Sequence, residues 1–346
     1  MNIKPLQKSM SKSEVTDIIV SCKSIECLKS AIESVEFNQL FYLKFITDAD
    51  VHNILQALSA HSLSLGISFA QHMQSVYALI ECNITDFTDT GLIYSATTTV
   101  NGSSLTSLVE LMHIEGQLSR VCPVISFFSL ASHILFTGKI ADKPVLVFAP
   151  IKELNILHHH FLQGMGMHEN KISSVTFSLD SRKALIIENN IKFILNEVIA
   201  FYAHYLWSIC WNSTMRAMFD SLLHFISNKK NEAIFLRLNK LNNLLVINDS
   251  LIMRVSRIAS EKISHIDKHV VLNSAKLIIS ENASQFADIF MQSLGFKNGY
   301  MAVNDDRLHN QYHDLKSAVY MFNNDTLYDI NFKSILLSFQ LSGREK

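Results

Sequence analysis

The stretch Leu162-Gln163-Gly164-Met165-Gly166-Met167-His168, which leads into Ser173-Ser174-Val175-Thr176-Phe177, separates two parts of the chain with opposite character. Gly164 and Gly166 end a segment rich in glycine and proline, whereas neither residue type occurs from Met167 to Leu294. Glycine and proline are the strongest local signals for turns. The pattern therefore predicts short strands joined by turns before this point and long helices after it.

The segment before the boundary carries the signals of a β-domain. Six of the ten glycines and three of the four prolines fall between residues 91 and 166. Short runs of β-branched and aromatic residues in and just after this segment have ordinary strand length. The expected strands cover Val124–Phe128, Ser132–Thr137, Pro144–Phe148 and Ser174–Phe177.

Helical sequence flanks the β-domain on both sides. The first 90 residues contain only Pro5 and Gly66 as breakers, and Val51–Leu79 is a long helical run. We predict a mostly α-helical chain with a helical domain over residues 1–90, a central β-domain over 91–180 and a C-terminal helical bundle over 181–346. Within the bundle, Leu251, Val255, Ile258 and Ala259 recur at helical spacing behind Asp249 or Ser250 as the expected N-cap.

Composition excludes several classes of protein. With 30 basic and 31 acidic residues the net charge is -1, so no general attraction to nucleic acid or to an anionic membrane is expected. The five cysteines are scattered without a CxxC pair, which argues against a disulfide framework or a zinc site. The N-terminus lacks the apolar core of a signal peptide, so a cytoplasmic location is expected.

Two further features bear on membranes and assembly. Phe193–Cys210 is the most apolar long stretch, but Asn196, Glu197 and His204 are costly in a bilayer, so we expect a buried helix of a bundle. The 48% hydrophobic content predicts large helix-helix or subunit interfaces.

Four stretches resemble motifs of the acyl-CoA dehydrogenase family, in the family's order. The opening stretch is similar to "GMR.T.S..V.F", which closes the β-domain of that family. The others are His61–Gly66 with Ala70-Gln71-His72, similar to "D.S.A.....H"; Ser213–Asp220, similar to "G.ARAALD"; and Gln292–Gly295, Asn298–Tyr300, Arg307-Leu308 and His313–Leu315, similar to "Q..GG.GY…ER..RDA". The resemblance implies an N-terminal helical domain, a β-barrel domain and a C-terminal four-helix bundle.

The resemblance also implies FAD as cofactor, an acyl thioester on CoA or an acyl carrier protein as substrate, and a homodimer or homotetramer assembled through the bundle. In the family a glutamate removes the α-proton while the flavin accepts hydride from the β-carbon. The positions expected to contact FAD are Ser103, in the loop Gly102-Ser103-Ser104, and Lys229, Gln292 and Gly295. Lys229 stands where the family has an arginine that meets the pyrophosphate of a neighbouring subunit's FAD.

The proton acceptor of the family is not found at its usual places. Phe322 aligns with the catalytic glutamate, and the position on an earlier helix that some members use falls on Ala203. The catalytic residue is therefore left unassigned, and the leading hypothesis is a divergent flavoprotein that oxidises an acyl thioester.

Two alternatives stay open. The first is a catalytically silent member of the family that acts as a partner or subunit. The second is a reduced-flavin monooxygenase, with His72 as an active-site histidine; His204 lies beside the alternative base position. The run His158-His159-His160 is expected to form a solvated loop, since three adjacent side chains cannot face one metal ion.

Overall fold

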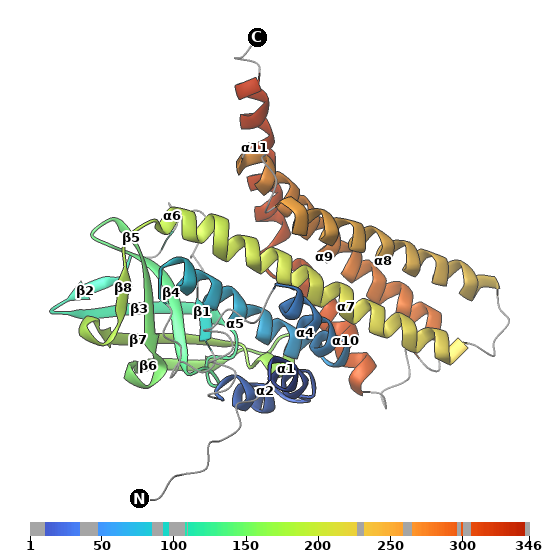
Figure 1. The fold of residues 1–346 in the computed structure, drawn as a ribbon, viewed down its shortest axis with the longest axis horizontal. Coiled ribbons are helices and arrows are strands. Elements are labelled where there is room, and N and C mark those ends of the chain that lie inside the picture. The colour runs from blue at the N-terminus through green and yellow to red at the C-terminus, as the bar shows by residue number, and fades with distance from the viewer. Residues whose placement is uncertain are drawn as a thin grey trace, which may run out of the picture.

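A computed structural model describes residues 11–34, 48–84, 93–96, 108, 110–226, 232–258, 265–295, 299 and 306–342. The predicted order is confirmed: N-terminal helices come first, then a β-domain, then long C-terminal helices. The β-domain lies at one end of the molecule and the long helices run away from it (Figure 1).

The N-terminal helices are α1 (Lys12–Val20), α2 (Ile25–Ile32), α4 (Asp48–His61) and α5 (Leu63–Glu81). Ser11 and Glu14 form a capping box at the start of α1. Helix α5 has no acidic or basic residue before Glu81 other than His72, and most of its side chains are buried. It therefore runs through the centre of the molecule, in contact with α4, α7 and β1.

The β-domain consists of two four-stranded sheets. One has the order β1 (Ile93–Ala96), β4 (His133–Ile140), β5 (Lys143–Pro150) and β8 (Leu185–Ile187); the other has the order β2 (Met112–Ile114), β3 (Gln117–Ile125), β7 (Ser173–Asp180) and β6 (Asn155–Phe161). Only the β1–β4 pair is parallel among the described strands. Phe136 and Phe177 meet edge to face between the sheets, with ring centroids 5.3 Å apart.

The expected strands at Ser132–Thr137, Pro144–Phe148 and Ser174–Phe177 coincide with parts of β4, β5 and β7, whereas β1, β2, β6 and β8 were not expected. The expected strand at Val124–Phe128 ends early, because β3 stops at Ile125 and Phe127 takes a left-handed φ of 56°. Short single turns join the strands and lead out of them: η2 (Ile151–Glu153), η3 (His168–Asn170) and η4 (Ser181–Lys183).

The C-terminal part begins with α6 (Ile191–Phe193) and the π-helical η5 (Ile194–Ala200), which continue into α7 (Phe201–Ile226). It goes on with α8 (Glu232–Ile258), α9 (His265–Gly295), α10 (Asp306–Lys316), η7 (Ser317–Val319) and α11 (Asn324–Ser342). The predicted N-cap at Asp249 or Ser250 is wrong. Helix α8 already begins at Glu232 and runs through both residues, since its apolar face, including Val255 and Ile258, is covered by the bundle core.

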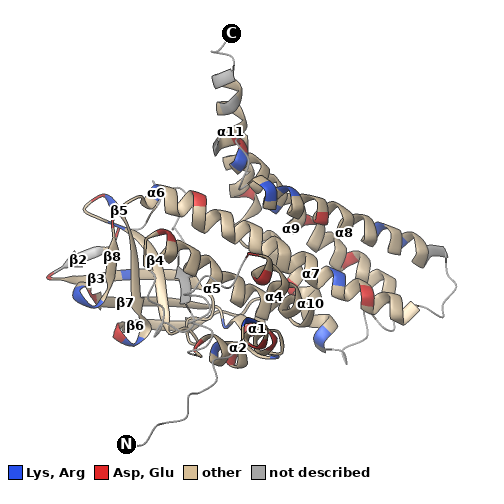
Figure 2. Ribbon diagram, viewed as in Figure 1, with Lys and Arg blue, Asp and Glu red and all other residues tan. Residues whose placement is uncertain are grey.

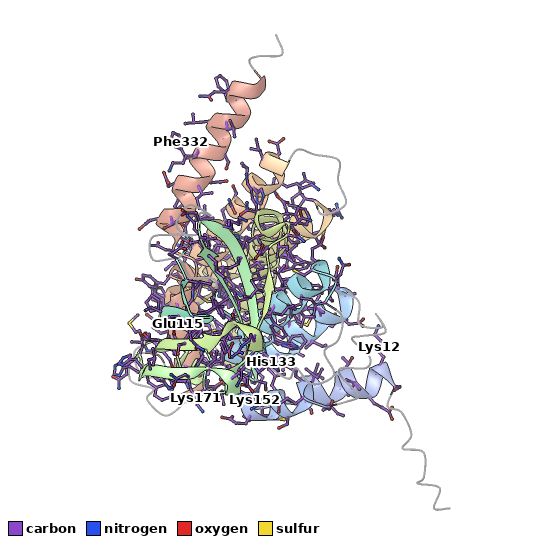
Figure 3. The ribbon with its side chains drawn as sticks, turned by 90° about the vertical axis from the view of Figure 1, so that its left-hand side faces the viewer. Lys12, Glu115, His133, Lys152, Lys171 and Phe332 are labelled. Atoms are coloured by element: carbon purple, nitrogen blue, oxygen red, sulfur yellow. The ribbon has the colours of Figure 1, made fainter. Side chains whose placement is uncertain are left out.

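Ile191–Ile226 is the one stretch of described residues that is long and apolar enough to cross a membrane, and half of its most apolar window is buried inside the molecule. Such burial is also what a core helix of a bundle shows. Basic and acidic residues are interspersed over the helices (Figure 2). Helix α11 leaves the bundle, and its Phe332 points outward with 60% of its surface exposed (Figures 1 and 3).

Candidate functional site

The glycine stretch that separates the two parts of the sequence packs directly on α10. A Cβ atom on Gly166 would lie 2.4 Å from the carbonyl oxygen of His313, so only glycine allows the two backbones to approach this closely. The next residue, Met167, donates its backbone N–H to the carboxylate of Asp314. Burial raises the pKa of Asp314 to about 6. Two of the stretches that carry the family resemblance, the glycine stretch and His313–Leu315, are thus in direct contact.

The other two stretches join the same place. The Thr214 hydroxyl of α7 donates to the carbonyl of Ser59 at 2.8 Å, and Gly66 leaves room for the Ser59 side chain, which a Cβ atom there would strike. The Ser62 hydroxyl donates to the carboxylate of Glu169 at 3.0 Å. We call this meeting point, defined by Ser59, Gly66, Gly166, Thr214 and Asp314, the junction. Its hydrogen bonds and close contacts connect the N-terminal helices, the β-domain and the bundle.

Phe322, which aligns with the expected base, contacts the residue that follows the alternative base position, Ala203. The ring of Phe322 lies edge-on to that of His204, with centroids 4.9 Å apart, and Ala203 precedes His204 on α7. His204 is 2% exposed, and burial lowers its pKa to about 3, so the imidazole is neutral. Phe322 has a left-handed φ of 51°, which is strained for a residue with a bulky side chain.

Lys276 of α9 is the functional group here that the sequence reasoning missed. Its ammonium nitrogen is fully buried and donates to the Phe322 carbonyl at 3.1 Å and to Asn324 Oδ1 at 2.6 Å. It also lies 5.8 Å from the ring centre of Trp211. Burial lowers the pKa of Lys276 to about 7, against a smaller opposing effect of Glu281. The available signal was a single lysine inside the apolar run at residues 275–279.

Lys276 belongs to a polar stripe on one face of α9. The stripe is formed by His269, Asn273, Lys276 and Ser280, which follow one another at helical spacing. At its outer end, His269 Nε2 pairs with Glu197 at 2.7 Å, and both side chains are about a quarter exposed. At its inner end, the Ser280 hydroxyl contacts Asn324 Oδ1 at 3.2 Å. The stripe therefore runs from the surface into the bundle core beside Phe322.

Two tryptophans of α7 lie beside Lys276 and His204, and their indole N–H groups lack a hydrogen-bond acceptor. The N–H groups of Trp207 and Trp211 are buried and have no hydrogen-bond partner. Buried donors without partners are uncommon in folded proteins and indicate a place for water or for a ligand atom that accepts hydrogen bonds.

The remaining histidines divide into buried and exposed ones. His72 lies in the interior of α5 with 3% of its surface exposed, and burial lowers its pKa to about 3. The sequence predicted a loop at His158, His159 and His160, which is wrong. The three residues lie in strand β6, because their backbones pair in register with β7. Their side chains are exposed as predicted, and the described residues contain no cluster of three metal-ligating side chains.

Of the four expected cofactor positions, Ser103 and Lys229 lie outside the described residues. Gln292 and Gly295 lie at the end of α9, where Arg237 of α8 donates to the Gln292 carbonyl at 2.8 Å. A Cβ atom on Gly295 would meet nothing within 4 Å. This end of the bundle is remote from the β-domain in Figure 1. The structure therefore does not bring Gln292 and Gly295 to the sheets of the same chain.

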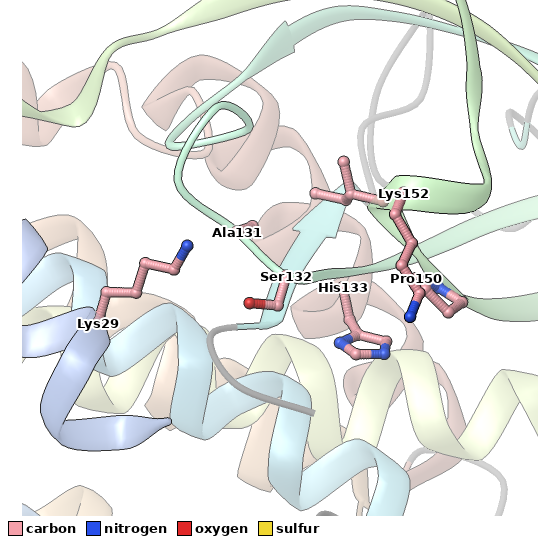
Figure 4. A pocket seen from close by; sticks show the side chains of 7 residues that line it. Lys29, Ala131, Ser132, His133, Pro150 and Lys152 are labelled. Carbon is pink, nitrogen blue, oxygen red and sulfur yellow. The ribbon is translucent and has the colours of Figure 1, made fainter. Parts of the chain in front are cut away.

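Two shallow hollows on the described part of the chain lie elsewhere. One, of about 430 Å³, lies between α2 and the β-domain (Figure 4); its walls are Lys29, Ala131, Ser132, His133, Pro150, Ile151 and Lys152. The other, of about 340 Å³, is lined by Asp48, Ala49, His52, Asn53, Tyr205 and Ser256. Neither includes a residue of the junction or of the core around Phe322.

Known structures match this arrangement over nearly the whole chain. Butyryl-CoA dehydrogenase from Megasphaera elsdenii matches with a TM-score of 0.71 at 11% identity, over 94% of this chain and 90% of that one. The prolyl acyl carrier protein oxidase AnaB matches with 0.74 at 12% identity, over 94% and 99%. An FAD complex of PigA matches with 0.70 at 13% identity, over 98% and 100%.

No family model and no curated protein matches the sequence. The chain has the acyl-CoA dehydrogenase fold, which confirms the fold predicted from its motifs.

Proposed function

We propose that this chain is an acyl-CoA dehydrogenase-like flavoprotein that binds FAD and accepts an acyl thioester, on CoA or on an acyl carrier protein. The supporting observation is the fold, shared almost from end to end with a butyryl-CoA dehydrogenase, an acyl carrier protein oxidase and an FAD complex. When bound, FAD would supply the oxidising power for the α,β-oxidation. The chain would supply binding, orientation and the group that takes up the proton.

Two features of the described residues support an FAD site at the end of α9. No described atom lies within 4 Å of a Cβ atom built on Gly295. The guanidinium of Arg237 lies next to Gln292 and would offer positive charge to an anionic group. Ser103, which the family resemblance also expects to contact FAD, lies outside the described residues, whereas the described sheets lie at the other end of the molecule (Figure 1). One FAD would therefore lie between the β-domain of one chain and the bundle end of a second copy.

Exposed apolar side chains on two helices support such an assembly. They lie on α8 and α11, and a homodimer or homotetramer would bury them. The residues, each at least 43% exposed, are Phe235, Leu236, Val246, Ile247 and Met253 of α8, and Tyr328, Phe332, Ile335, Leu336, Leu337 and Phe339 of α11.

Lys276 is the group we propose to take up the α-proton in place of the missing carboxylate. A pKa of about 7 leaves about half of its side chains unprotonated at neutral pH, which suits a general base. Its contact with the Phe322 carbonyl places it beside the position where the family resemblance expects the glutamate. The indole N–H groups of Trp207 and Trp211 would donate to the thioester carbonyl.

A catalytically silent partner subunit is the second candidate, because a specific observation favours it. Phe322, His204 and Lys276 pack together, and none of the three lines either of the two hollows described above. In this case FAD and oligomerisation would be retained for assembly. The monooxygenase alternative has less support, since His72 lies buried inside α5.

One preparation separates these functions. The purified protein is mixed with excess FAD, desalted, and its visible spectrum is recorded before and after anaerobic addition of acyl-CoA. A retained flavin spectrum that bleaches supports the dehydrogenase. A retained spectrum that does not bleach supports the silent subunit. Loss of all flavin on desalting rules out both flavin-dependent activities, the dehydrogenase and the monooxygenase.

The role of Lys276 needs matched variants. Lys276→Met is expected to keep the flavin and lose bleaching by at least tenfold in rate, whereas the exposed Lys240→Met is expected to bleach like the wild type. Bleaching of Lys276→Met at the wild-type rate would exclude this residue as the proton acceptor.

A further inference from the structure

Cys22 and Cys27 meet at the corner between α1 and α2. The Cys27 thiol donates to the Cys22 sulfur, with the two sulfur atoms 3.0 Å apart. Cys22 is buried in the main hydrophobic core, while Cys27 is exposed in the first turn of α2. A buried thiol in contact with an accessible one is the arrangement in which one sulfur is attacked from solvent and the other resolves the product.

We propose that Cys22 and Cys27 form a redox-active pair that closes reversibly to a disulfide when the chain meets a small-molecule disulfide such as glutathione disulfide. This inference does not depend on the proposed flavin chemistry. It assigns a covalent modification site to the N-terminal helices. The two sulfur atoms are 3.0 Å apart, so they need to move only about 1 Å closer to reach the S–S bond length of about 2 Å.

The exchange proceeds in two balanced steps. The Cys27 thiolate attacks one sulfur of glutathione disulfide, which forms a mixed disulfide and releases one glutathione thiolate. Cys22 then loses its proton to water and attacks the Cys27 sulfur, which releases the second glutathione. The chain loses two protons and two electrons in total, and glutathione disulfide is reduced to two thiols.

The contrast between the two thiols sets the order of these steps. Burial raises the pKa of Cys22 to about 12, so this thiol is rarely the attacking thiolate in solution. Its contact with Cys27 means that the mixed disulfide, once formed, has a second sulfur beside it. The other cysteines, Cys82, Cys122 and Cys210, are half-buried or buried, and none of them contacts another cysteine.

The corner that the bond would fix connects two parts of the molecule. Helix α1 is tied to α4 by the ion pair between Lys12 and Asp50 at 2.6 Å. Helix α2 is tied to the β-domain, where the Ser132 hydroxyl donates to Glu33 at 2.6 Å. A disulfide would hold α1 and α2 at one angle and so brace the N-terminal helices against the β-domain, next to the cavity lined by Lys29 and Lys152 (Figure 4).

The sequence offers a direct assay. Trypsin cleaves after Lys23, which separates Cys22 and Cys27 into peptides covering residues 13–23 and 24–29. After incubation with glutathione disulfide and blocking of free thiols, we expect these two peptides to be joined in the wild type. They should separate on treatment with dithiothreitol, and the intact mass should fall by two hydrogen atoms on oxidation.

Three cysteine-to-serine variants test the role of each thiol. Cys82→Ser should behave like the wild type, Cys27→Ser should form no linked peptide, and Cys22→Ser should stop at a glutathione adduct on residue 27. Oxidation should also raise the thermal unfolding midpoint of the wild type and leave that of Cys27→Ser unchanged. If the wild type accumulates the glutathione adduct on Cys27, or keeps both thiols free after this incubation, the proposal is overturned. Since Cys22 is buried, the wild-type result decides even if Cys22→Ser fails to fold.

Discussion

The junction and the bundle core around Phe322 follow the family pattern to different degrees. In the junction, Gly166 and Asp314 keep the residue types of the stretches shared with acyl-CoA dehydrogenases, and they bring backbones into contact. In the core, Phe322 stands where the family resemblance expects a carboxylate, and the Lys276 ammonium group donates to the Phe322 carbonyl. A close backbone contact tolerates few side chains, whereas a titratable group can be exchanged if its buried neighbours remain satisfied. Fold and chemistry can therefore diverge within one chain.

The largest expected effect is the pH dependence conferred by Lys276. Its pKa is about 7 in the folded chain and 10.5 ordinarily, so the unfolded chain binds more protons between these values. Stability should therefore rise from pH 7 to pH 10.5, by about 4 kcal/mol from this group. Urea unfolding across this range should show a weaker rise in Lys276→Met than in the wild type and in the exposed variant Lys240→Met. Equal slopes in all three would mean an ordinary pKa for Lys276.

At the junction, Gly166→Ala tests the close approach of two backbones. The added Cβ would strike the His313 carbonyl, and the backbone cannot yield as a side chain can. We expect a loss of about 3 kcal/mol in the free energy of unfolding. The matched control is Met165→Ala, next to it, where the side chain is 66% exposed. A loss at Gly166 no greater than that at Met165 would show that the junction is loose.

The buried imidazole of the core predicts sensitivity to acid. The pKa of His204 is about 3 in the folded chain against 6.5 ordinarily, so stability is lost as pH falls below 6.5. Between pH 6.5 and pH 5 the loss from this group should be about 2 kcal/mol. His204→Leu, which can pack on Phe322, should lose less on acidification, and the exposed control His158→Leu should behave like the wild type in the same denaturation series.

The smallest effect is expected at Asp314 of the junction. Its pKa is about 6 when folded and 3.8 ordinarily, so the folded chain binds more protons and stability falls as pH rises from 3.8 to 6. Asp314→Asn keeps an oxygen for the Met167 N–H and should be more stable than the wild type at pH 7, by about 1 to 2 kcal/mol. The gain should shrink at pH 4, and the exposed Asp329→Asn should show none.

The sequence predicted the fold well because its signals are local. The uneven distribution of glycine and proline separated the β-domain from the helical parts of the chain, and the motifs predicted the fold that the structure shows. The N-cap at Asp249 failed because tertiary burial of α8 overrides a local capping preference.

The site was only partly predictable. The resemblance directed attention to Phe322 and to Ala203 beside His204, but it did not predict that the rings of Phe322 and His204 meet. Lys276 lies 46 residues from Phe322 along the chain, and their contact depends on how α9 packs. A contact between distant segments leaves no local pattern. The Cys22–Cys27 pair was likewise invisible as a spacing motif, because the turn between two helices creates it.

With its intact junction and altered core, the chain is expected to remain a flavoprotein. The FAD content of the purified protein, after saturation with FAD and desalting, tests this through the visible spectrum and the flavin released on denaturation. We expect about one FAD per chain in an oligomer. A protein that elutes free of flavin, with its fold intact by circular dichroism, would show that the altered core has lost the cofactor.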